Sequence, residues 1–130
     1  MTELPEDVAA LLTSEPLMAH LATCVDSRPH VAPVWFAYDT GNEVIEVLTT
    51  GRKLANIREN PRVALSVQKD IDGQAQWRVT MLGTATVVDD DEATRKSAQR
   101  INQRYGAEGT AWPENDLVRI SVGTATVKEY

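Results

Sequence analysis

The stretch QWRVTMLGTATVV, residues 76–88, alternates between apolar and polar side chains along most of its length. A period of two residues is typical of a strand with one face buried and the other face in solvent. A strand of this length needs a sheet around it. The apolar positions share one side of the strand and the polar positions share the other: Trp77, Val79, Met81, Ala85 and Val87 against Arg78, Thr80, Thr84 and Thr86.

Five further runs of strand-forming residues accompany this segment, and turn-forming sequences at 26–29 and 39–42 separate the early ones. The chain has 130 residues, the usual size of one domain. Closely spaced strands with little helix predict a mainly β fold, a six-stranded antiparallel barrel that forms a single domain over residues 1–130. The other five predicted strands are residues 17–25, 30–38, 43–50, 62–68 and 117–127.

The last predicted strand changes its alternation part-way along. Its apolar residues occupy even positions up to Val122 and odd positions from Ala125 onward, with Gly123 between them. An extra residue in one strand of a pair produces such a change of parity, and glycine tolerates the irregular backbone. The sequence therefore predicts a β-bulge or sharp bend at Gly123.

Three helices are expected between the strands. The first begins at Pro5, the second covers residues 52–59, and the third runs from residue 91 to about 105. Gly106 suits the C-terminal cap of the third helix, whose first turn is acidic. The third helix should lie on the surface, because its apolar stripe is narrow: Ala98, Ile101 and Tyr105.

Composition excludes several classes of protein. The formal net charge of −6 argues against a binder of nucleic acid or of an anionic membrane, since both need a basic face. One cysteine and two histidines make a structural metal site unexpected. The N-terminal sequence lacks the features of a signal peptide and no apolar run is long enough to span a membrane, so a cytoplasmic location is expected.

Two of the predicted strands are apolar on both faces. In LMAHLATCV (17–25) and VAPVWFAY (31–38) the alternation seen in residues 76–88 is missing. Both faces of such strands must be covered. One face can fill the barrel, but a single surface helix covers little of the other face. A partner subunit is the simplest cover, so a homodimer is expected.

The sequence TTGRK, residues 49–53, places two cations at the start of a helix. The helix N-terminus already carries partial positive charge, so Arg52 and Lys53 are unfavourable there without an anion. Free backbone N–H groups and the hydroxyls of Thr49 and Thr50 suit a phosphate group. The alternative is that both cations are solvated surface residues without a ligand.

The order and spacing of three segments resemble the pyridoxamine 5′-phosphate oxidase-like superfamily of flavin-binding split β-barrels. The segments are LATCVDSRPHVAPVWFAYD, LTTGRKLANIRENPRVALSV and WRVTMLGTATVV, within residues 17–88. The resemblance implies a homodimeric FMN-binding split-barrel domain with the cofactor at the dimer interface. In one branch of the superfamily a deazaflavin coenzyme replaces FMN.

The resemblance also implies roles for particular residues. Those matching Thr49, Thr50, Arg52 and Lys53 hold the phosphate and ribityl chain, while the strand containing Pro33, Val34 and Trp35 runs beside the flavin ring. The strand with Trp77 and Arg78 reaches the cofactor from the other subunit. Pro33 also predicts an edge strand or bulge, because proline lacks the N–H that an inner strand needs.

The chain departs from the oxidase that names the superfamily. It lacks the Arg of the second strand and the C-terminal segment whose Arg and His grip pyridoxine phosphate, so oxidation of vitamin B6 is not expected. The favoured function is an FMN-dependent oxidoreductase that acts on an unidentified small molecule. The alternatives are a deazaflavin-dependent reductase of the same fold and a non-catalytic flavin- or haem-binding module, for which His20 and His30 are candidate ligands. No catalytic residue is predicted.

Overall fold

The computed structural model describes residues 4–130, and within them it contains three helices and seven strands. The mainly β fold predicted from the sequence is confirmed, and all three predicted helices are present. The elements follow one another as α1 (Glu6–Thr13), β1 (Ala19–Val25), β2 (Arg28–Val34), β3 (Phe36–Asp39), β4 (Val44–Thr49), α2 (Gly51–Glu59), β5 (Arg62–Ile71), β6 (Gln74–Val88), α3 (Asp91–Arg104) and β7 (Asp116–Glu129).

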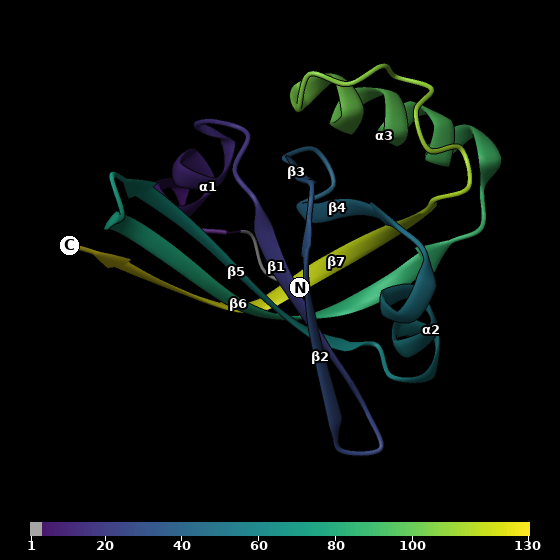
Figure 1. Ribbon diagram of the computed structural model, residues 1–130, viewed down its shortest axis with the longest axis horizontal. Helices are drawn as coiled ribbons and strands as arrows, with labels where there is room; N and C mark the ends of the chain where they lie inside the picture. Colours follow the sequence, from purple (N-terminus) through teal and green to yellow (C-terminus); the bar gives the residue numbers. More distant parts are fainter. Residues whose placement is uncertain (1–3) are drawn as a thin grey trace.

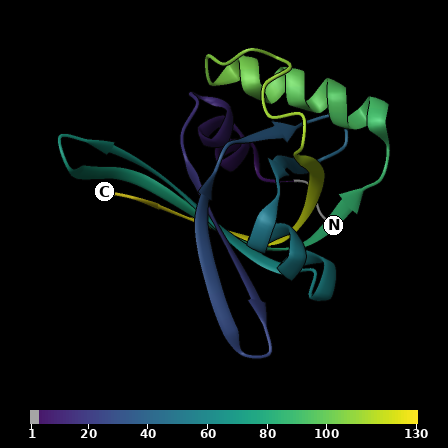
Figure 2. The ribbon, with the colours of Figure 1, turned by 45° about the vertical axis from the view of Figure 1, so that its right-hand side comes forward.

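All seven strands belong to one antiparallel sheet in the order β2-β1-β5-β6-β7-β4-β3. The long strand β6 lies at its centre, between β5 and β7. The sheet bends strongly, and the β1–β2 and β5–β6 hairpins extend away from the middle of the molecule in different directions (Figures 1 and 2).

The prediction of a six-stranded barrel was wrong in strand number and in closure. The predicted strand 30–38 is divided at Trp35 into β2 and β3, which form the two opposite edges of the sheet. Because only Trp35 separates them along the chain, the sheet must curl until its edges come close together there. No pairing joins β2 to β3 within residues 4–130, so the sheet stays open.

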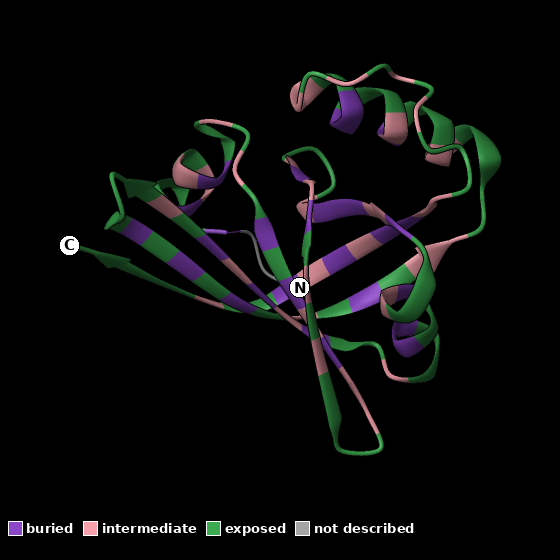
Figure 3. Cartoon of the chain, in the orientation of Figure 1, coloured by how far each residue is buried: buried purple, intermediate pink, exposed green. Residues whose placement is uncertain are grey.

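The core lies inside the curl of the sheet. Strand β6 buries Trp77, Val79, Met81 and Ala85 and exposes most of the residues between them, as the alternation predicted. Helix α1 adds Val8 and Leu12 to the same apolar cluster, whose other large, fully buried members include Leu21, Phe36, Ile45, Leu65 and Ile120 (Figure 3).

A β-bulge occurs at Gly123, as predicted. In the β6–β7 pair Leu82 is opposite Thr124 and Gly83 is opposite Val122, so Gly123 has no partner in the ladder. The backbones approach closely here, since a Cβ atom on Gly83 would lie 2.6 Å from the carbonyl oxygen of Ser121. The bulge increases the local twist and helps the two long strands to follow the curl.

A buried carboxylate attaches α3 to the sheet. Glu46 of β4 is fully buried, and its Oε2 lies 2.9 Å from Nε of Arg119, its neighbour on β7. Its Oε1 accepts hydrogen bonds from Arg100 and from the Ser97 hydroxyl, the latter at 3.1 Å. Two cations and a hydroxyl thus compensate for the loss of water around this charge.

We expect Glu46→Gln to destabilise the fold by about 1–3 kcal/mol, because charge-assisted hydrogen bonds are lost while both arginines still reach water. Glu92→Gln is the matched control. Glu92 forms an exposed pair with Lys96 on α3, and its loss should change stability by less than about 1 kcal/mol. Urea unfolding of both variants measures the difference, and equal effects would contradict the role given to Glu46.

Candidate functional site

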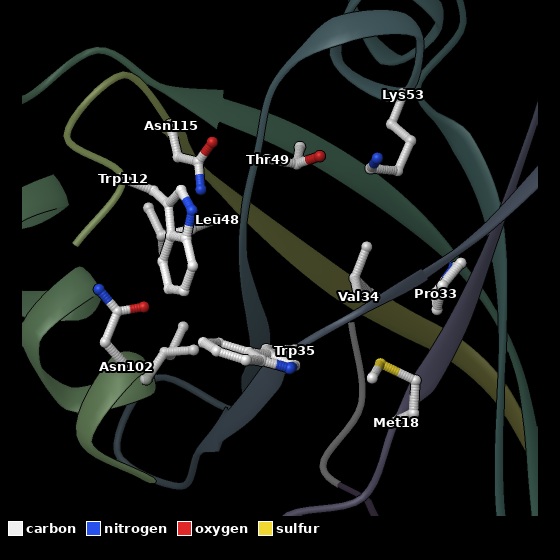
Figure 4. Close-up of a pocket in the computed structure, with 11 residues that line it drawn as sticks. Met18, Pro33, Val34, Trp35, Leu48, Thr49, Lys53, Asn102, Trp112 and Asn115 are labelled. Atoms are coloured by element: carbon white, nitrogen blue, oxygen red, sulfur yellow. The ribbon is translucent and has the colours of Figure 1, made fainter. Parts of the chain in front are cut away.

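A cavity of about 270 Å³ lies where the two edges of the sheet come together. It is bounded by the end of β2, the end of β4, the first turn of α2, and α3 with the loop that follows it (Figure 4). The residues that line it are Met18, Pro33, Val34, Trp35, Leu48, Thr49, Lys53, Ile101, Asn102, Trp112 and Asn115.

Five residues predicted from the sequence line this cavity together: Pro33, Val34, Trp35, Thr49 and Lys53. They come from two segments that meet only because β2 ends beside the end of β4. Pro33 lies on an edge strand, as its missing N–H predicted.

Thr50 and Arg52 lie next to the cavity along the chain but do not line it. Both are exposed. Successive residues of a helix point about 100° apart, so Arg52 and Lys53 cannot face the same way. That Thr50 and Arg52 help to hold a ligand therefore stays a prediction.

Trp77 and Arg78 lie elsewhere in the chain's own structure. Trp77 is buried in the core, and Arg78 projects from the opposite face of β6, between Gln68 and Lys128 in the register. Neither lines the cavity. Their predicted approach concerned the cofactor of a second subunit, and it stays a prediction.

Neither histidine lines the cavity. In the β1–β2 hairpin His20 is opposite Pro33 and His30 is opposite Thr23. Their positions along β1 differ by an odd number of residues, so the two side chains lie on opposite faces of the sheet. They cannot act together on one bound group within this chain.

One end of the cavity is positively charged. Lys53 projects toward it and forms no ion pair with any residue in the part of the chain that the structure describes (Figure 4). Helix α2 begins at Gly51, which has a φ of +69°, and Thr50 provides no side-chain cap for its N–H groups. The first turn contains no acidic residue. The ammonium group and the start of the helix thus favour an anion at this end.

Aromatic rings form another wall. The Trp35 ring stacks on Tyr105 with centroids 4.8 Å apart and an interplanar angle of 7°, and it meets Trp112 edge-on at 5.2 Å. The Tyr105 hydroxyl donates to the carbonyl of Leu17 at 2.6 Å and accepts from the N–H of Phe36 at 3.1 Å. Burial raises the pKa of Tyr105, which keeps this donor protonated. The stack therefore holds Trp35 in one orientation.

Sequence reasoning missed the two amides, Asn102 and Asn115, and three apolar residues of the lining: Met18, Leu48 and Ile101. Asn102 lies on a helix that is polar on most sides, so nothing in the pattern marked it as buried. From the sequence alone, the loop 106–116 could cover a cofactor site with Trp112 stacked there, or Trp112 could serve in ordinary packing. Trp112 does line the cavity, together with Asn115 from the same loop.

The sequence model of the family described as pyridoxamine 5′-phosphate oxidase matches residues 4–128. The chain belongs to this family. The resemblance seen in the sequence is thereby confirmed.

Named relatives show which activities occur among proteins similar to this chain. The F420H(2)-dependent biliverdin reductase of Mycobacterium tuberculosis is 33% identical over 104 residues, which cover 80% of this chain and 74% of that protein. A solved structure of an F420 reductase is 28% identical, with a TM-score of 0.76 over 95% of this chain and 98% of that one. The family around this chain thus includes reductases that use a deazaflavin coenzyme.

A more distant structure shows the fold alone. The haem storage protein HutZ of Vibrio cholerae has a TM-score of 0.77 at 21% identity, over 98% of this chain and 95% of that one.

We expect Tyr105→Phe to lower the free energy of unfolding by about 1–3 kcal/mol, because the Leu17 carbonyl and the Phe36 N–H both lose their partner while the ring stack remains. Tyr130→Phe, at an exposed position, is the control and should change little. Thermal unfolding followed by near-UV circular dichroism measures both. An unchanged stability in Tyr105→Phe would show that the hydroxyl does not anchor α3.

Proposed function

We propose that this protein is a reductase that holds a flavin-type cofactor in the cavity and uses it to reduce a small molecule. The observation that carries the proposal is the pairing, in one cavity, of an uncompensated cation at a helix start with an oriented aromatic wall. A flavin or deazaflavin coenzyme has the matching parts, a phosphate group on a chain that leads to a planar ring.

The charged end suits the phosphate. Lys53 offers an ammonium group, and the uncapped first turn of α2 offers backbone N–H donors. The hydroxyl of Thr49, on the last residue of β4, lines the same end. An anion there would turn an unfavourable local charge into a favourable one.

The apolar part suits the ring. Most of the wall beside the end of β2 consists of five apolar residues: Trp35, Val34, Pro33, Leu48 and Met18. When bound, the cofactor would supply the hydride chemistry, and the chain would provide orientation and shelter from water. Within residues 4–130 the cavity lining includes no histidine, cysteine or carboxylate, so we assign no acid or base to the protein.

We favour the deazaflavin coenzyme over FMN. Two relatives, at 33% and 28% identity, are both named for F420, and one of them covers nearly the whole chain. FMN is the second candidate, because its phosphate and ring would meet the same groups. Biliverdin is the first substrate to test, since the relative from Mycobacterium tuberculosis is named for it. In an assay of biliverdin reduction with the bound, reduced cofactor, a binding module without turnover would bind the cofactor but would not reduce the substrate.

We also propose a homodimer, with a partner on the outer face of the sheet. The register places Val31, Ala22, Ala64, Leu82 and Thr124 in one row across five strands, on the face away from the core. Val31 is 64% exposed and Leu82 is 57% exposed. Four of these five residues are apolar, and an apolar row on an outer face is typical of a surface that another subunit covers.

We also propose a cytoplasmic location, which the sequence led us to expect. None of the helices in the described part of the chain is long and apolar enough to cross a bilayer.

The purified protein should bind the deazaflavin coenzyme or FMN with micromolar or tighter affinity. Lys53→Ala should weaken binding by about 1.5–3 kcal/mol, roughly 10- to 150-fold in Kd, because one charge-assisted contact is lost. Adding Arg52→Ala should weaken it further if the guanidinium also reaches the phosphate. Lys96→Ala, the same change on the exposed side of α3, is the control. Calorimetric titration with both cofactors measures these affinities. If the unmodified protein binds neither cofactor, the proposal is refuted.

Native mass spectrometry should show a dimer, and Leu82→Arg should shift it toward the monomer because a charge would be buried in the interface. Gln103→Arg, at an exposed position of α3, should leave the dimer intact. A monomer in the unmodified protein at micromolar concentration would rule out the dimer.

A further inference from the structure

The cavity contains one polar group whose orientation is set by the protein. Asn102 on α3 is only 4% exposed, and its amide nitrogen donates to the carbonyls of Ala111, at 3.1 Å, and Gly109, at 3.4 Å. A carbonyl oxygen accepts hydrogen bonds and does not donate them, so the nitrogen must face the loop. The side-chain oxygen is therefore turned away from the loop and toward the cavity (Figure 4).

This oxygen is available to a ligand. It accepts no hydrogen bond from any residue in the range 4–130, and it lies on the wall of a cavity that is otherwise largely apolar. Without a protein donor this oxygen is left to water in the cavity. A ligand that displaces the water loses free energy there unless it presents a donor such as an N–H, which would recover that loss. A ligand that presents a carbonyl or an alkylated nitrogen at the same place would recover nothing.

The neighbouring rings restrict the shape of that ligand. Trp35 is held by its stack on Tyr105, and Trp112 meets it edge-on, so flat surfaces bound the space beside Asn102. A planar molecule can lie flat against one of these rings, and its hydrogen-bonding groups then lie on its edge, in the plane of the ring. The donor that reaches the Asn102 oxygen is accordingly a ring N–H.

We propose that Asn102 is a specificity-determining residue whose side-chain oxygen accepts a hydrogen bond from the lactam- or imide-type N–H of a planar ring in the cavity. This proposal rests on the proposed function. It adds that the uncharged end of the cavity prefers a planar ring that carries an N–H donor. Two molecules can supply this donor: the cofactor, whose ring carries an imide N–H, and a substrate that carries a lactam N–H.

The first experiment changes the ligand and leaves the protein intact. We expect the unmodified protein to bind FMN or the deazaflavin coenzyme at least about tenfold more tightly than the same cofactor methylated on its imide nitrogen. Asn102→Ala separates hydrogen bonding from crowding. If the hydrogen bond carries the preference, the variant loses affinity for the unmethylated cofactor and binds the methylated one as before. If crowding alone carries it, the variant gains affinity only for the methylated cofactor, and the proposal fails for the cofactor.

The second experiment tests the substrate as the source of the donor. With the cofactor bound, the KM for biliverdin should rise at least about tenfold in Asn102→Ala if a lactam N–H of the substrate meets the oxygen, with no difference between the methylated and unmethylated cofactors. Gln103→Ala, at the exposed position next to Asn102 on α3, is the matched control. It lies outside the cavity lining and should bind both forms of the cofactor and turn over biliverdin as the unmodified protein does.

The possible failures are distinguishable. Cofactor binding that ignores both methylation and Asn102→Ala, together with an unchanged KM for biliverdin, would overturn the role of Asn102 and leave the proposed function standing. No binding of either cofactor by the unmodified protein would overturn both.

Discussion

The curl of the sheet is the constraint on which the rest of the structure depends. Strands β2 and β3 follow one another along the chain, yet they occupy opposite edges of a seven-stranded sheet. A single residue, Trp35, connects them. A flat sheet of this order would separate the two edges by the width of five strands, so the chain can close this connection only by bending the sheet on itself. The bend encloses the core and brings the ends of β2 and β4 together.

The cavity is a consequence of that bend. The edges approach at Trp35 without pairing, and α2 and α3 flank the place where they meet. Tyr105 ties α3 to both sides of the gap, through the Leu17 carbonyl before β1 and the Phe36 N–H at the start of β3. Glu46 holds the same helix to β4 and β7. The aromatic wall is therefore rigid, whereas Lys53 sits on a separate short helix, so the two ends of the cavity are supported by different parts of the fold.

Periodicity in the sequence predicted most of the local structure. The burial of β6 and the bulge at Gly123 both followed from counting which positions are apolar. The division of residues 30–38 did not, because both halves have strand-forming residues and only the order of strands in the sheet separates them. That order depends on contacts between distant segments, which no local pattern encodes.

For a similar reason, the sequence predicted only some of the residues in the candidate site. Charge at a helix start drew attention to Lys53, but helical geometry, not composition, decides that Lys53 and not Arg52 faces the cavity. Glu46 and Asn102 escaped notice because a polar residue in a strand or on a polar helix normally faces water. Their burial is visible only once α3 is placed against the sheet.

The segment between α3 and β7 contributes Trp112 and Asn115 to the cavity but no strand to the sheet. Substitutions, insertions and deletions in this segment can therefore reshape the binding surface while the curled scaffold stays as it is. Evolution of new selectivities in chains of this architecture is expected to concentrate there, with the lysine end conserved for anchoring and the opposite end free to diverge.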